Sequence, residues 1–361
     1  MLGNRNQRIA AAVVAGIGVL GGIGLAFLGG GDDSAAPATT TAAETTTTAP
    51  PATIPLPVAP LTGLPGEYGD RLGRPALVVK IDNGEPKSRP QVGINEADVV
   101  YEERVEGAVT RLLAVFHSTD SVPVGPVRSA RTSDIAIVSA LHRPYFAWSG
   151  ANATFAQRIR AANLVDVGYD ARSGEYFRES SRSAPSNLML KSTATLQALG
   201  VEGATPPPPL FPFRPADAEV AHLEDAVGVR LNFGSSGGSA PVEYRWNGTG
   251  WARTQAGTPH VDAAGVQVAP ANVVIQFVSY AGTDVNDQFG NAIPEAQTVG
   301  EGEVWILTSG GANRAGLVQG RWRKSALDAV TTYTDIDGNP ILFTPGRTWV
   351  ALPPVGGGSR L

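Results

Sequence analysis

The sequence contains no cysteine among its 361 residues. A disulfide, a thiolate zinc site and a thiol nucleophile are therefore excluded, and so is attachment of a lipid to an N-terminal cysteine. The chain also lacks a surplus of basic residues, since its formal net charge is -5. Proteins that bind nucleic acids usually carry a strongly basic face, so we expect no nucleic-acid partner.

Sequence motifs of several enzyme classes are missing as well. The four histidines, His117, His142, His222 and His260, are too widely scattered to match metal-ligand spacing. We therefore predict no metal site and expect each histidine at the surface or at its boundary. Ser149-Gly-Ala is not the G-x-S-x-G elbow of α/β hydrolases, and the glycine pairs lack the strand-to-helix setting of a phosphate loop. No cofactor is predicted.

A long uncharged run near the N-terminus predicts a membrane anchor. Arg5 and Arg8 precede this run, residues 9–28, and Asp32 follows it. About 20 apolar residues span a bilayer, whereas the apolar core of a cleaved signal peptide has only about 7–15. The charge asymmetry predicts that residues 1–8 are cytoplasmic and that the rest of the chain lies outside. We therefore expect a single-pass protein of the cell membrane, anchored by a transmembrane helix.

Composition divides the remainder of the chain into three parts. Residues 29–60 are mostly Ala, Thr and Pro, which predicts a disordered stalk because such a segment buries little apolar surface. Residues 61–203 mix strand and helix patterns and predict a mixed α/β domain. The prolines at 206–209 indicate a linker over residues 204–215. Residues 216–361 carry almost only strand patterns, so we predict a β-rich C-terminal domain.

A β-hairpin is predicted between Glu96 and His117. Glu106-Gly107 suits a two-residue turn because glycine adopts the positive φ that such a turn needs. This turn sets Glu102 opposite Arg111. A turn shifted by one residue would instead place Arg104 against Arg111, an unfavourable like-charge pair.

Local signals predict the other elements. Helices are expected from Thr132 or Ser133 to Arg143, over Ala153–Asn163, and from Ser186 or Asn187 to Gly200. Strands are expected on both sides of the turn within Tyr244–Trp251, over Val273–Tyr280 and Glu303–Thr308, and on both sides of Asp337-Gly338.

Charged residues concentrate near the expected core strands of the α/β domain, where they are costly unless they are paired or face a cleft. One reading is a set of internal salt bridges. The other is a pocket for an anion, because Arg128 and Arg131 directly precede a predicted helix start and guanidinium groups bind phosphate or carboxylate. The predicted ligand-binding residues are Asn83, Arg89, Arg111, Arg128 and Arg131.

Acidic residues offer an alternative chemistry. Asp98 and Glu102 would lie roughly 13 Å apart on one strand, farther than the roughly 5–10 Å of paired glycosidase carboxylates. Asp82, Glu96 and Glu102 remain as weak candidates for a general acid or base. Whether the fold brings Asp82 near either glutamate does not follow from the sequence.

Several segments together resemble the YerB family, which comprises bacterial predicted lipoproteins with a domain of unknown function. The resemblance rests on Arg74–Asn83, Arg89–Gln91, Ala97–Glu102, Thr110–Phe116, Gly125–Arg131, Gly320–Lys324 and Pro345–Trp349. It implies an N-terminal α/β domain and a C-terminal β-rich domain on the envelope side, and no established activity. The chain departs from the family pattern in lacking a lipidated cysteine, in having Ser186 where many relatives have histidine, and in lacking a histidine near Trp148.

Three functional hypotheses follow. The first is a membrane-anchored envelope protein that binds a polar or anionic cell-wall or glycan ligand without catalysis. The second is a metal-independent hydrolase of an envelope polymer, with a carboxylate as general acid or base. The third is a scaffold for envelope assembly that uses the β-rich domain as its contact surface.

Overall fold

The computed structural model describes residues 55–84, 86–215, 218–234, 240–287, 290–310 and 314–361. The predicted transmembrane anchor at 9–28 and the stalk up to residue 54 lie outside this described part. Within it, no helix combines the length and the apolar character needed to cross a membrane. Residues Ile54–Leu361 group into one compact unit. The folded part begins slightly before the predicted boundary at residue 61, because Ala59 is fully buried.

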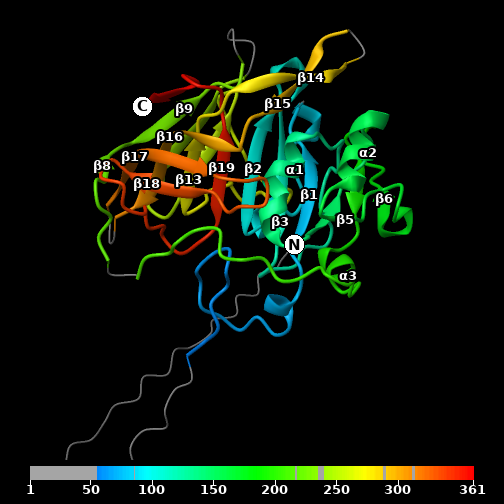
Figure 1. The fold of residues 1–361 in the computed structure, drawn as a ribbon, viewed down its shortest axis with the longest axis horizontal. Coiled ribbons are helices and arrows are strands. Elements are labelled where there is room, and N and C mark those ends of the chain that lie inside the picture. The colour runs from blue at the N-terminus through cyan, green and yellow to red at the C-terminus, as the bar shows by residue number, and fades with distance from the viewer. Residues whose placement is uncertain (1–54, 85, 216–217, 235–239, 288–289, 311–313) are drawn as a thin grey trace, which may run out of the picture. The chain divides into compact units, whose positions relative to one another are not determined.

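A large mixed sheet runs through the molecule (Figure 1). In spatial order its strands are β18 (Thr332–Asp335), β17 (Ala315–Lys324), β16 (Gly300–Ser309), β13 (Asn272–Gln276), β19 (Thr348–Leu352), β2 (Val99–Arg104), β3 (Thr110–Phe116), β1 (Leu77–Asp82), β4 (Tyr145–Ala147) and β5 (Val165–Asp166). The short strand β8 (Glu224–Asp225) also pairs with β17. The described chain is β-rich with few helices.

The two predicted domains share this sheet. Strand β19, near the C-terminus, pairs in parallel with β13 on one side and with β2 on the other. Every residue of β1 and of β19 is buried, as expected for strands covered on both faces. The sequence boundary near residues 204–215 therefore does not interrupt the sheet.

Different layers cover the two faces of the sheet (Figure 1). Helices α1 (Ser133–Val138) and α2 (Ala153–Ala161) contribute Ile137, Val138 and Ile159 to the core on one face. The other face packs against α3 (Thr193–Gln197) and against a five-stranded sheet. The order of that sheet is β12 (Thr258–Pro259), β11 (Trp251–Gln255), β10 (Val242–Trp246), β9 (Gly228–Leu231) and β20 (Gly358–Arg360).

Two hairpins lie outside these sheets. Strands β6 (Tyr176–Arg178) and β7 (Leu188–Leu190) pair with each other, as do β14 (Tyr280–Asn286) and β15 (Ala292–Ala296). The β14–β15 hairpin extends past the end of the main sheet (Figure 1). Val285 and Ile293 from this hairpin bury against Phe155 of α2. This small apolar cluster holds the hairpin beside the helix.

Several local predictions are confirmed, and others are wrong. Helices α1 and α2 form where expected, and β10 pairs with β11 across the predicted glycine turn. The third predicted helix is mostly wrong, because Leu188–Leu190 is a buried strand and only Thr193–Gln197 is helical. The predicted linker at 204–215 is packed rather than free, since Phe211 is buried and its ring lies 4.7 Å from that of Phe343.

The predicted register of the β2–β3 hairpin is wrong. Residues 105–109 connect the strands, with Glu106–Ala108 forming the short helical turn η4, and both Gly107 and Ala108 have positive φ. Glu103 therefore pairs with Arg111, and Glu102 faces Leu112. Because side chains alternate along a strand, Glu102 and Arg111 point to opposite faces of the sheet. The polar residues of this hairpin thus form two separate clusters.

Candidate functional site

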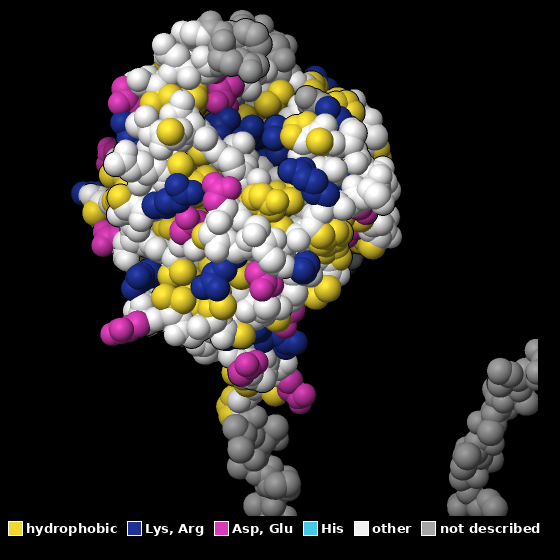
Figure 2. Space-filling model, turned by 90° about the vertical axis from the view of Figure 1, so that its right-hand side faces the viewer, with side chains coloured by type: hydrophobic (Ala, Val, Ile, Leu, Met, Phe, Trp, Pro, Cys, Tyr) yellow, Lys and Arg dark blue, Asp and Glu magenta, His cyan; other side chains and the backbone are white. Residues whose placement is uncertain are grey.

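An open hollow of about 450 Å³ lies beside the β2–β3 loop. Arg111 and Arg131 line it, together with Asn152 at the start of α2 and Asn286 from β14. One face of the molecule carries Lys and Arg side chains in and around a hollow (Figure 2). We call the hollow lined by Arg111 and Arg131 the arginine hollow. Its basic lining makes it a candidate site for an anion.

Arg111 is the residue that stands out in the arginine hollow. The side chain extends from the start of β3, and the residue is only 8% exposed. Within the described residues its guanidinium makes a single hydrogen bond, 2.8 Å from Nη1 to the carbonyl oxygen of Ser129, and no ion pair with a carboxylate. A buried charge without a paired countercharge is costly, so this guanidinium has unused capacity to bind an anion.

The other two arginines of the predicted site have acidic partners. Arg131 donates from Nε and Nη2 to Glu106 Oε2, at 3.0 and 2.8 Å, and from Nη1 to the carbonyl oxygen of Ala130. Arg128 is partly exposed, and its Nε lies 3.0 Å from Asp82 Oδ2. Both members of the predicted pair thus have acidic partners, whereas Arg111 has none among the described residues.

The electrostatics of Arg111 reflect this imbalance. The pKa of Arg111 is lowered to about 10, first by burial and then by the nearby charges of Arg131 and Arg128, while Glu106 and Asp82 oppose the change. The guanidinium stays charged at neutral pH. The lowered pKa means that the surroundings disfavour the charged form of the Arg111 guanidinium. A bound anion would offset this unfavourable electrostatic energy.

A second polar cluster lies on the opposite face of the sheet. Glu102 is fully buried and accepts hydrogen bonds from Arg253 Nη2 at 2.7 Å and Trp349 Nε1 at 3.1 Å. Arg253 Nη1 lies 2.6 Å from His260 Nδ1, and His260 Nε2 lies 2.7 Å from Gln91 Oε1. Glu102 and Gln91 come from the N-terminal half and the others from the C-terminal half. The network therefore joins the two halves through the buried interior.

Sequence reasoning missed this network. Arg253 was not among the candidate residues, and His260 was expected near the surface but is only 1% exposed. His117 is also fully buried, contrary to the prediction. No local signal identifies these residues, because Arg253 and Glu102 lie 151 positions apart in the chain.

Asn83 and Arg89 belong to the edge of this network rather than to the arginine hollow. Asn83 is buried and donates from Nδ2 to Thr110 Oγ1 at 2.7 Å and to Gln255 Oε1 at 3.0 Å. Arg89 is half-buried, and its Nη1 lies 3.3 Å from Asn83 Oδ1. The predicted ligand-binding residues thus separate into two groups. Asn83 and Arg89 form one group, and Arg111, Arg128 and Arg131 form the other.

The three acidic candidates are not brought together. Glu96 is exposed at the end of the short helical turn η3 (Ile94–Glu96) and precedes β2, at most roughly 20 Å from Glu102 by strand rise. Glu102 is enclosed by its partners. Asp82, at the end of β1, is held by Arg128 and by Ser186 Oγ, 2.8 Å from Asp82 Oδ2. Within the described ranges, no three His, Asp or Glu side chains gather closely enough to hold a metal ion.

Comparison with known proteins supports one family. Residues 61–205 match the N-terminal domain, and residues 229–350 the C-terminal domain, of the family described as protein of unknown function (DUF3048). The chain is 28% identical over 307 residues to "Putative lipoprotein YerB" of Bacillus subtilis (strain 168), covering 82% of this chain and 86% of the relative. The chain belongs to the YerB family.

A solved structure supports the fold of the family. The crystal structure of the YerB protein from Bacillus subtilis matches with a TM-score of 0.70 at 24% identity, over 84% of this chain and 99% of that one. At this identity the likeness concerns the fold alone. The predicted family and the predicted presence of a β-rich C-terminal part are therefore confirmed.

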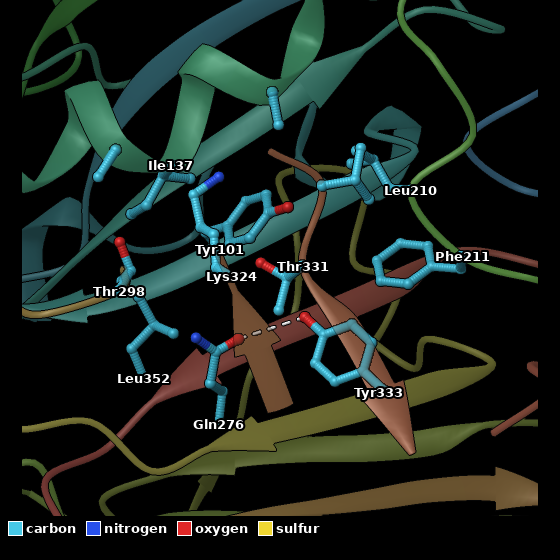
Figure 3. Close-up of a pocket in the computed structure, with 13 residues that line it drawn as sticks. Tyr101, Ile137, Leu210, Phe211, Gln276, Thr298, Lys324, Thr331, Tyr333 and Leu352 are labelled. Atoms are coloured by element: carbon cyan, nitrogen blue, oxygen red, sulfur yellow. Dashed lines mark hydrogen bonds between the residues drawn. The ribbon is translucent and has the colours of Figure 1, made fainter. Parts of the chain in front are cut away.

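The YerB-family fold also encloses a small cavity apart from the arginine hollow (Figure 3). Its volume is about 20 Å³, enough for one water molecule. Tyr101, Thr298 and Lys324 line it, and the Tyr333 hydroxyl donates to Gln276 Oε1 at 3.2 Å beside it. A cavity of this size does not admit an organic ligand, which leaves the arginine hollow as the better candidate.

Proposed function

We propose that this YerB-family chain is a membrane-associated protein of the cell envelope that binds an anionic group in the arginine hollow. The similarity to a protein described as a lipoprotein supports a place at the outer side of the membrane. Because the chain has no cysteine, the apolar run at 9–28 would supply the attachment that a lipid supplies in lipoproteins. The folded part would then face the envelope.

The observation that carries the proposal is Arg111, which is buried, charged and without a carboxylate partner among the described residues. It projects into an open hollow rather than into a closed core. Charged groups that are buried for structural reasons are normally paired. An anionic ligand would supply the missing partner.

Two neighbours would strengthen the binding. Arg131 lines the same hollow and is fixed by Glu106, so its charge is already oriented. Asn152 caps helix α2, whose N-terminal end carries a partial positive charge worth about 0.3–1 kcal/mol to a nearby anion. A phosphate or carboxylate group could accept hydrogen bonds from Arg111 while lying near both.

The test is calorimetric titration of the full-length chain with glycerol 3-phosphate and, separately, with a carboxylate sugar, glucuronate. Arg111→Gln removes a charge-assisted hydrogen bond worth about 1.5–3 kcal/mol, so we expect the affinity to fall by about 10–100-fold. Arg323→Gln, which changes an exposed arginine on β17, is the matched control and should bind as the natural chain does. Equal affinity of a folded Arg111→Gln variant would refute the proposal.

A further inference from the structure

A second hollow of about 260 Å³ lies at the β2–β3 loop next to the arginine hollow. Val105, Glu106 and Asp287 line both hollows. The two hollows therefore adjoin each other, and we call them together the trough, which borders the β2–β3 loop on one side and Asp287 on the other. An open trough of this kind has room for a chain that enters at one end and leaves at the other.

A second arginine stands at the far end of this trough. Arg104 lines the second hollow, and its guanidinium carbon lies 4.4 Å from the centre of the Tyr280 ring. The Tyr280 hydroxyl accepts from the Arg104 backbone N–H at 3.0 Å and donates to the Leu352 carbonyl at 2.7 Å. Stacking on a fixed ring orients a guanidinium and leaves its N–H edge available.

Arg104 resembles Arg111 in lacking a countercharge. Within the described chain its side chain makes no ion pair with a carboxylate. Glu106, which lies between the two ends of the trough, is already engaged with Arg131 at 2.8 Å, and Arg131 lowers the pKa of Glu106 although burial opposes the change. Glu106 is therefore held by Arg131 and offsets the charge of Arg111 only in part.

The register of the hairpin separates the two guanidinium groups. Arg104 pairs with Thr110, and Arg111 is the next residue along β3. Side chains of consecutive residues point to opposite faces of a strand, so Arg104 and Arg111 leave the hairpin on opposite faces. A compact anion at Arg111 cannot contact Arg104. A flexible chain that passes around the loop can contact both.

We propose that the trough binds a linear polyanion, with one anionic group of the chain at Arg111 and another at Arg104. This inference rests on the proposed function for the first of these positions and adds the second. The net charge of -5 disfavours general attraction of polyanions, so binding would depend on this local arrangement. The repeating anionic group is a phosphodiester or a carboxylate.

The test uses two series of increasing length, glycerol-phosphate oligomers and oligoglutamates, each titrated against the full-length chain. We expect affinity to rise by at least about tenfold once an oligomer spans both arginines, as for linked binding groups, and then to level off. Arg104→Gln should abolish this rise while keeping the affinity for glycerol 3-phosphate. Arg111→Gln should weaken both, and Arg323→Gln should change neither. The series that shows the rise identifies the anionic group.

Two outcomes separate this inference from the proposed function. If glycerol 3-phosphate or glutamate binds through Arg111 but length adds nothing, or Arg104→Gln keeps the rise, the extended site is wrong and the proposed function stands. If no member of either series binds, the proposed function fails as well. Melting curves of each variant show whether a loss of binding reflects a loss of folding.

Discussion

The buried pair of Arg253 and Glu102 should contribute strongly to stability, and Arg253→Met tests this. Methionine keeps most of the apolar bulk of the side chain but removes its donors. The change leaves Glu102 fully buried with hydrogen bonds from Thr110 Oγ1 at 2.9 Å and Trp349 Nε1 at 3.1 Å, and without a countercharge. It also removes the 2.6 Å contact between Arg253 and His260.

The expected loss follows from the burial of both partners. Their side chains are both 0% exposed, and removing one partner of such a pair costs about 3–5 kcal/mol. Because Glu102 retains these hydrogen bonds, we expect the free energy of unfolding to fall by about 3 kcal/mol, the lower end of this range. In urea unfolding this loss lowers the midpoint by about 1 M if the slope is near 3 kcal/mol per molar.

Arg230→Met is the matched control for this experiment. Arg230 on β9 pairs with Glu243 at 2.7 Å, but its side chain is 54% exposed. Exposed pairs contribute only about 0–1 kcal/mol, so this variant should unfold close to the natural chain. If Arg253→Met lowers the free energy of unfolding by no more than Arg230→Met does, the network is not a main link between the two halves.

Local sequence signals predicted the local elements of the fold. The turn between Trp246 and Trp251, the start of α1 near Thr132 and the start of α2 at Ala153 depend on neighbouring residues, and the structure confirms them. Helix α2 ends at Ala161, two residues before the predicted end. The parallel pairing of β19 with β2 could not be predicted. It joins segments from opposite ends of the folded part, and many apolar strands would satisfy the same pattern.

The β2–β3 loop shows why the candidate site was predicted only in part. A two-residue turn was the simplest expectation because glycine occupies position 107, but Ala108 also adopts positive φ, at 56°. Such a conformation is uncommon for a residue with a Cβ atom, and the alanine at this position gives no sign of it in the sequence. The shift places Glu103 instead of Glu102 opposite Arg111, but Glu103 pairs with Lys80, so Arg111 has no carboxylate partner among the described residues.

The identity of the arginines was easier to predict than their state of pairing. Arg128 and Arg131 were candidates because they precede a helix, yet both have acidic partners. Arg111 was included among the candidates only as one charge of several. Which of the three lacks a partner depends on contacts with Asp82 and Glu106, and these follow from the fold.

Two further predictions concern topology and pH. A reporter enzyme fused after Leu361 should be active only outside the cytoplasm, because Arg5 and Arg8 precede the apolar run at 9–28; activity in the cytoplasm would contradict the proposed orientation. The other prediction concerns Glu103, which is buried with Lys80 and Asp134. The pKa of Glu103 is raised from 4.5 to about 7, first by burial and also by the charge of Asp134, while Lys80 opposes the change. Between these two pH values the folded chain holds a proton that the unfolded chain has lost. The contribution of this group to stability is therefore full below about pH 4.5 and falls as the pH rises towards 7, by about 1.4 kcal/mol for each pH unit that separates the folded and unfolded pKa values. Glu103→Gln mimics the protonated acid at every pH. The urea midpoint of this variant, relative to that of the natural chain, should therefore rise between about pH 5 and pH 8. Parallel pH profiles for the two proteins would show that Glu103 does not titrate in this range.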